Sequence, residues 1–311
     1  MSLLNRPSDG LHSVLVVVFK LLLKEKEVAR DRLIALCGPA GAVEGNQVRQ
    51  TLNTWLEFGL FEEDSEKGVM LHADVRRDER DPEKLGRLTR RLVLRAENNP
   101  NLWAVEKAKA ADFTRALCWL LAQDVYTTTF SGGEELLRKL RQQLPRDLIG
   151  DDEQELRFVT NTSRWPGLKA WCVWFGFGWS GSFPNKVLVL DPTSAVRDTL
   201  PAIFPKARST MAAHALISAL AQALPVLDGG TYRMEVENRL REQTGADAWV
   251  PPPNEQVSTS LSRAILRLQA ENILRAEEKA DWKETRVRLT GRNQALIQSI
   301  THFSYHPKAG D

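Results

Sequence analysis

The chain has 311 residues, a length at which one hydrophobic core usually gives way to two or three domains. Hydrophobic residues make up 42% and charged residues 26%, a balance that fits a globular protein and excludes a disordered one. The formal charge of +2 excludes a globally basic nucleic-acid binder, so any DNA-binding surface must be locally basic.

The most apolar segment is "VLVVVFKLLL", Val14–Leu23. It is too short to span a bilayer, contains Lys20, and lacks the flanking features of a signal peptide, so it predicts a buried helix and no membrane partner. Cys37, Cys118 and Cys172 lie far apart, which argues against a disulfide framework and a zinc site. We expect a cytoplasmic protein without a metal or other cofactor.

The first part of the chain predicts three helices: 13–24, 29–36 and 46–58. The third has an apolar stripe at helical spacing, formed by Val48, Leu52, Trp55 and Leu56. Gly59 is expected to end it in a left-handed conformation. The segments "LFEE" and "VMLH", separated by a polar turn, then predict a hairpin. This order is typical of a winged helix-turn-helix, which we place at residues 1–80.

The middle of the chain, residues 81–205, predicts a helical linker and a divergent winged-helix-like unit. The expected helices are 82–99, 112–123, 133–143 and one running from a cap at Thr162 or Ser163 towards Phe175. "FGW" suggests a stop at Gly178, followed by a turn and the strand "KVLVL". The last helix, "LKAWCVWF", is apolar almost all round, which favours burial or a partner site. The candidate protein-interface residues are Trp171, Trp174 and Trp179, with core packing as the other interpretation.

The linker helix also carries a basic stripe at spacings of three and four residues, formed by Lys84, Arg87, Arg91 and Arg95. Contact with phosphate and a solvated helix face both remain open for this stripe.

Residues 206–311 predict a second complete winged helix-turn-helix. Its helices are expected at 212–224, 232–243 and 259–271. Asn272 takes the place of Gly59, because asparagine also tolerates the left-handed conformation. "ILRAE" and "TRVRLT" are expected to pair as the wing. "HFSYH" near the end is interpreted as a frayed tail and not as a metal site.

Winged helices bind DNA by laying the third helix in the major groove. Its outward face in the first unit offers Asn46, Arg49, Gln50 and Asn53. In the last unit the helix and wing offer Ser262, Arg263, Arg267, Lys279 and Lys283. These side chains suit base edges and phosphates, although many winged helices bind only proteins.

No convincing active site is present in the sequence. "GPAGAVEGN" lacks the Gly-Lys-Ser/Thr ending of a phosphate loop. "DPTSAVRD" reads as a helix start, with Asp191 as its cap and Pro192 in the first turn. We therefore expect a protein that is not an enzyme.

Three phrases, "NRPSDGLHSVLVVVFKLLL", "FGFGW" and "VLVLDPTSAVRDTLP", together resemble the DpdG proteins of bacterial gene clusters that insert 7-deazaguanine derivatives into DNA and restrict unmodified DNA. The resemblance implies an accessory protein that acts with other subunits of a defence complex. Combined with the residues, it leads to a mainly α protein with small β wings, built from tandem winged helix-turn-helix units that bind double-stranded DNA and dock onto that complex. A protein-binding scaffold and a transcription regulator that binds DNA as a homodimer remain alternatives.

Overall fold

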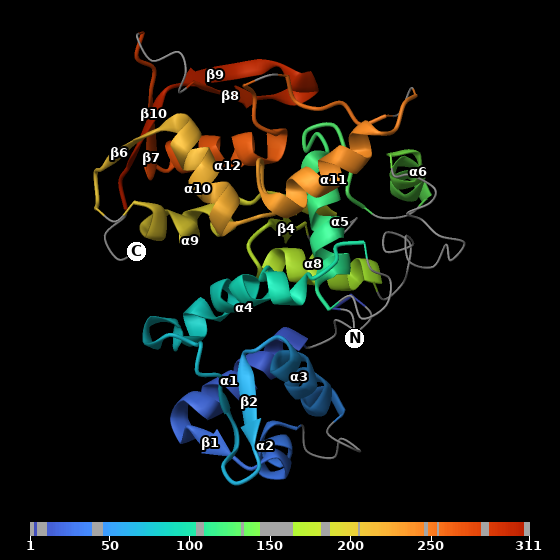
Figure 1. Ribbon diagram of the computed structural model, residues 1–311, viewed down its shortest axis with the longest axis vertical. Coiled ribbons are helices and arrows are strands. Elements are labelled where there is room, and N and C mark those ends of the chain that lie inside the picture. Colours follow the sequence, from blue (N-terminus) through green and yellow to red (C-terminus); the bar gives the residue numbers. More distant parts are fainter. Residues whose placement is uncertain are drawn as a thin grey trace.

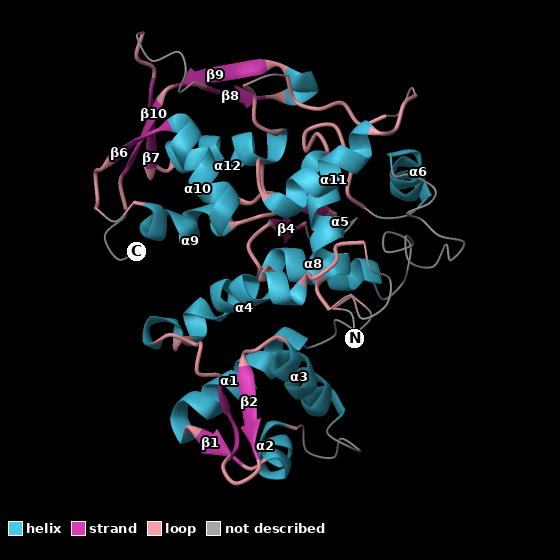
Figure 2. Cartoon of the chain, viewed as in Figure 1, coloured by secondary structure: helices cyan, strands magenta, loops and turns pink. Residues whose placement is uncertain are grey.

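The computed structural model describes residues 3–4, 11–38, 46–103, 109–131, 134–143, 164–181, 187–204, 206–245, 248–253, 255–280 and 286–307. The protein is mainly helical, with small sheets of antiparallel strands (Figures 1 and 2). The N-terminal helices lie at one end of the long axis and the C-terminal sheets at the other, with α4 and α8 between them (Figure 1).

The N-terminal unit has the expected helices and hairpin, together with a short strand that the sequence did not reveal. Its elements are α1 (Leu11–Glu25), β1 (Glu27–Val28), α2 (Arg30–Cys37), α3 (Asn46–Glu57), β2 (Phe61–Asp64) and β3 (Gly68–Leu71). The strands form an antiparallel sheet in the order β1-β3-β2. Val48, Leu52 and Trp55 are buried, as the stripe on α3 predicted.

The linker helix is shorter than the predicted range 82–99. It consists of 3-10 turns at Arg77–Glu79 and Pro82–Lys84, then α4 (Leu85–Val93), then a further 3-10 turn at Ala96–Asn98. The amide groups of Asn98 and Asn99 donate to the carbonyls of Leu92 and Val93 at 2.8 and 2.7 Å. Because these side chains satisfy carbonyls at the end of α4, the chain can leave the helix there.

The middle unit contains α5 (Ala111–Ala122), α6 (Glu134–Gln143), α8 (Arg164–Trp174), β4 (Gly178–Ser180) and β5 (Leu188–Leu190). β4 and β5 pair as the predicted hairpin. The caps proposed at Thr162 and Ser163 lie outside the described residues. Trp171 is buried, with its ring centroid 5.1 Å from that of Phe175 and 6.0 Å from that of Trp55 in the N-terminal unit. The two units therefore share a continuous aromatic core.

The C-terminal part has a more complex topology than predicted. Its elements are α9 (Thr193–Ile203), β6 (Thr210–Ala212), α10 (Ala213–Ala223), α11 (Thr231–Arg241), α12 (Thr259–Ala270), β7 (Leu274–Glu277), β8 (Val287–Thr290), a 3-10 turn at Arg292–Gln294, β9 (Leu296–Ile300) and β10 (His302–Tyr305). The predicted wing is wrong, because β7 pairs with β10 while β8 pairs with β9. The segment interpreted as a frayed tail is β10, a fully buried strand between β6 and β7.

The N-terminal and C-terminal sheets share one arrangement. In both, a strand between the first two helices and the two strands after the third helix form a sheet, in the orders β1-β3-β2 and β6-β10-β7. The match makes α9, α10 and α12 the counterparts of α1, α2 and α3, with α11 and the β8-β9 hairpin as additions. α9 packs against α10 and α12, although the sequence assigned it to the middle unit.

Three helices end in the same turn. Gly59, Gly176 and Asn272 follow α3, α8 and α12 with φ of 77°, 77° and 59°. In each turn the next residue donates its amide to the carbonyl five positions earlier, at 2.8 to 2.9 Å. This is the hydrogen bond of a Schellman motif, and it requires the left-handed conformation. The stop predicted at Gly178 is wrong by two residues, because Gly178 already lies in β4.

Candidate nucleic-acid interface

The outward face of α3 is the part of the predicted DNA surface that the structure leaves accessible. Arg49 and Asn53 are exposed and Gln50 is half-buried, whereas the opposite face packs into the core. Gln47, which the sequence reading did not select, is also exposed on this helix. The side chain of Asn46 lies outside the described part of the chain. Arg49 is the cation that this face offers to a phosphate.

The hairpin beside α3 is acidic. The exposed or half-buried carboxylates on it are Glu62, Glu63, Asp64 and Glu66, and its turn also carries the exposed Lys67. Arg30, at the start of α2, donates to the carboxylate of Glu63 and to the amide oxygen of Asn53. Asn53 is thus already engaged within the unit, and Arg30 compensates for one hairpin carboxylate. The remaining negative charge would repel a DNA backbone laid along the hairpin.

Most of the corresponding face of α12 is covered within the chain, which corrects the prediction for Ser262, although the Arg267 side chain is 54% exposed. Ser262 is fully buried, and its hydroxyl accepts the amide of Thr290 at 2.8 Å. Ser260 donates to the carbonyl of Leu121 at 2.8 Å, and Thr259 lies against the same end of α5. The start of the polar side of α12 is therefore an interface inside the chain, where its hydroxyls satisfy backbone groups at the end of α5 and on β8.

The two arginines proposed on α12 also make internal contacts. Arg263 donates to the carbonyls of Leu190 at 2.8 Å and Val125 at 3.1 Å, and its guanidinium lies 4.6 Å from the ring centroid of Tyr126. Arg267 pairs with the buried carboxylate of Asp191. Asp191 in turn accepts the amide of Thr193 at the start of α9, as the helix-start pattern predicted. Both arginines join α12 to the middle of the chain.

The two lysines proposed for the last wing do not form a basic surface within the described residues. Lys279 is exposed, and its ammonium group lies 3.5 Å from the carboxylate of Glu277. Lys283 lies outside the described residues.

The three candidate tryptophans of the middle unit differ in accessibility. Trp171 is buried in the core, which agrees with the core-packing interpretation for this residue. Trp174 is half-buried, and its ring N–H donates a hydrogen bond to the hydroxyl of Thr89 on α4 at 2.9 Å. Trp179, on β4, has 49% of its surface exposed and remains available to a partner.

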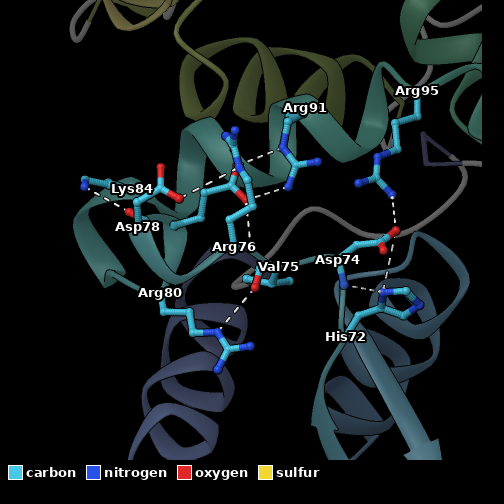
Figure 3. Close-up of polar contacts among 10 residues, drawn as sticks. His72, Asp74, Val75, Arg76, Asp78, Arg80, Lys84, Arg91 and Arg95 are labelled. Atoms are coloured by element: carbon cyan, nitrogen blue, oxygen red, sulfur yellow. Dashed lines mark hydrogen bonds and ion pairs between the residues drawn. The ribbon is translucent and has the colours of Figure 1, made fainter. Parts of the chain in front are cut away.

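Polar contacts fix the N-terminal unit against α4 (Figure 3). Glu79 is buried and accepts hydrogen bonds from Arg76 at 2.9 Å and from Arg91 at 2.7 and 2.8 Å. Burial alone would raise the pKa of Glu79, but these bonds outweigh it and the pKa is lowered. Arg95, just after α4, donates to Asp74 at 3.2 Å. Most of the predicted basic stripe is thus engaged within the chain.

The described residues contain no group of His, Cys, Asp and Glu that could hold a metal ion. Among the described helices, none combines the length and hydropathy needed to cross a membrane.

These features define a mainly helical protein of small helix-and-hairpin units, in which α3 presents an exposed polar face. The chain belongs to the DpdG-like family, whose family model matches residues 1–282. Membership associates it with the 7-deazaguanine DNA modification system and with a role among the several proteins of that system. Searches of curated proteins and of solved structures each gave no match.

Proposed function

We propose that this protein is a non-catalytic, cytoplasmic accessory subunit of the 7-deazaguanine DNA modification and restriction system, and that it contacts duplex DNA through α3. In this proposal the N-terminal unit is a winged helix and the C-terminal part is a second one with inserted elements. The rest of the chain docks onto other subunits.

The observation that supports DNA contact is the accessibility of α3 compared with α12. Both helices hold the third position in units of the same strand order. Ser262 and Arg263 on α12 are used inside the chain, and Arg267 is exposed but pairs with Asp191, whereas Gln47, Arg49 and Asn53 on α3 are exposed. A helix of this kind fits the major groove, where arginine and amide side chains reach base edges and phosphates.

The acidic hairpin restricts how DNA could lie on this unit. Four carboxylates beside α3 disfavour a wing that follows the phosphate backbone, so we infer that α3 alone enters the groove. The same hairpin supports a second candidate function, a protein-binding scaffold in which a basic partner covers α3 and the hairpin together.

Fluorescence anisotropy on random duplex DNA, from low to physiological salt, tests the first proposal. We expect affinity to fall log-linearly with salt, and Arg49→Ala to reduce the slope by about one. Arg292→Ala is the matched control, because Arg292 is exposed in the C-terminal part, far from α3. Absence of binding at low salt, or equal slopes for both variants and the parent protein, would favour the scaffold.

A further inference from the structure

Two pockets lie along α4, and Arg87 and Arg90 line both of them. The larger, about 470 Å³, lies between α4, the end of α8, and α9, and also has Lys84 and Arg197 in its lining. The smaller, about 320 Å³, adds Arg76 and Arg91. The wall shared by the two pockets is therefore made of guanidinium groups.

Arg90 forms the fixed part of this wall. Its side chain is 5% exposed and donates to the carbonyl of Phe175 at 2.8 Å and to Asp198 at 3.1 Å. Gly176 leaves room for it, since a Cβ added there would come within 3.3 Å of the guanidinium. Burial lowers the pKa of Arg90, Asp198 opposes this effect, and the nearby charge of Arg87 lowers the pKa further.

Arg87 differs from the other basic residues on and beside α4. Lys84, Arg91 and Arg95 each bind an oxygen of the segment before α4. Within the described part of the chain, the Arg87 guanidinium has neither a hydrogen-bond acceptor nor a carboxylate partner. It lies one turn from Arg90, whose carboxylate partner is Asp198. Glu83 also lines the larger pocket and Glu79 the smaller one, but each lining has more cations than carboxylates, so the wall carries a net positive charge. A bound anion would relieve this repulsion.

The lining of the larger pocket also suits an aromatic group. The half-buried Trp174 lines the pocket, as does Tyr305, whose buried ring stacks on Phe204. Arg197 donates its terminal NH2 to Glu271, whereas its Nε is a buried donor without an acceptor in the described structure. The pocket volume lies in the range of small-molecule sites. Because Arg90 is recessed, a terminal phosphate can approach it more closely than a phosphodiester within a duplex.

We propose that this pocket binds a small phosphate-bearing molecule of nucleotide size, whose terminal phosphate lies against Arg87 and Arg90. The adjacent, half-buried Trp174 would contact its base or another flat group. This proposal does not depend on DNA contact by α3.

Isothermal titration calorimetry on the full-length protein, with inorganic phosphate and with ADP as probes, tests the site. We expect saturable binding of both probes, with the higher affinity for ADP. Arg87→Gln should raise the Kd at least about tenfold, because one charge-assisted contact is lost. Arg77→Gln is the control, since Arg77 is an exposed arginine of the same region that lines neither pocket. It should bind like the parent protein.

No heat of binding from either probe, or equal affinities in Arg87→Gln and the parent protein, would overturn the proposal. A duplex-affinity measurement separates the sources of phosphate. If Arg87→Gln weakens duplex binding while ADP does not bind, the pocket serves the DNA backbone and the small-molecule proposal is wrong. Arg49→Ala should leave ADP binding unchanged, so failure of the DNA proposal would be seen separately.

Discussion

The three left-handed helix stops lead to an ordered set of stability changes. Replacing Gly59 with Ala forces a side chain into φ of 77°, but an added Cβ there has no described atom within 4 Å. The substitution should therefore lower the free energy of unfolding only through backbone strain, by about 1–2 kcal/mol. At Gly176 the same substitution brings Cβ within 3.0 Å of the Ala195 amide nitrogen and 3.1 Å of the Ser194 Cβ. Overpacking of this kind adds roughly 1–3 kcal/mol.

Asn272→Gly is the complementary change. It removes any residual strain at φ of 59° while loosening the unfolded chain, so we expect a net effect within about 0.5 kcal/mol. Urea unfolding followed by both tryptophan fluorescence and far-UV circular dichroism would measure the series, because two probes also reveal whether the units unfold together. Equal midpoints for Gly59→Ala and Gly176→Ala, or a loss in Asn272→Gly as large as that in Gly59→Ala, would refute this reasoning.

Two further predictions concern buried side chains. Ser258 caps α12, because its hydroxyl accepts a hydrogen bond from the Leu261 amide and donates one to Asp228 at 2.7 Å. Ser258→Ala should therefore lower the free energy of unfolding by about 1–2 kcal/mol. Ser65→Ala, in the exposed hairpin turn, is the control and should leave the free energy of unfolding unchanged. Thermal unfolding of both variants checks this, and equal melting temperatures would contradict it. Burial raises the thiol pKa of the cysteines, most strongly at Cys118 and Cys172, so at pH 8 iodoacetamide should modify these two only after unfolding in urea. Mass spectrometry of the labelled protein gives the answer, and rapid labelling of either in the folded state would show that the core is open.

The sequence predicted the local elements better than the way they pack. Helical periodicity located α3, α10, α11 and α12 to within two or three residues, because an apolar stripe and a breaking residue are local signals. Strand pairing is not local. Nothing in "ILRAE" or "TRVRLT" indicates that β7 pairs with β10 and not with β8, the next strand along the chain. The predicted pairing of β7 with β8 as a wing was therefore wrong.

The candidate DNA surface failed on α12 for a related reason. A polar helix face has the same pattern whether it meets water or the backbone of another unit. A weak signal was present, because the face begins with the short hydroxyls of Thr259, Ser260 and Ser262, which satisfy buried carbonyls and amides well but reach poorly towards a phosphate. Helical spacing places Arg87 beside Arg90, but the pocket that they line depends on the approach of α9, which periodicity does not reveal.

The place of β10 at the centre of its sheet has a consequence for synthesis of the chain. In the N-terminal unit, all three strands lie within one short stretch, so its sheet can close while later residues are still being translated. β6 and β7 emerge without each other as partners, since among the described strands each pairs with β10 and with no other. The C-terminal sheet therefore stays open until β10 has left the ribosome, and its exposed strand edges must be protected from aggregation during that interval.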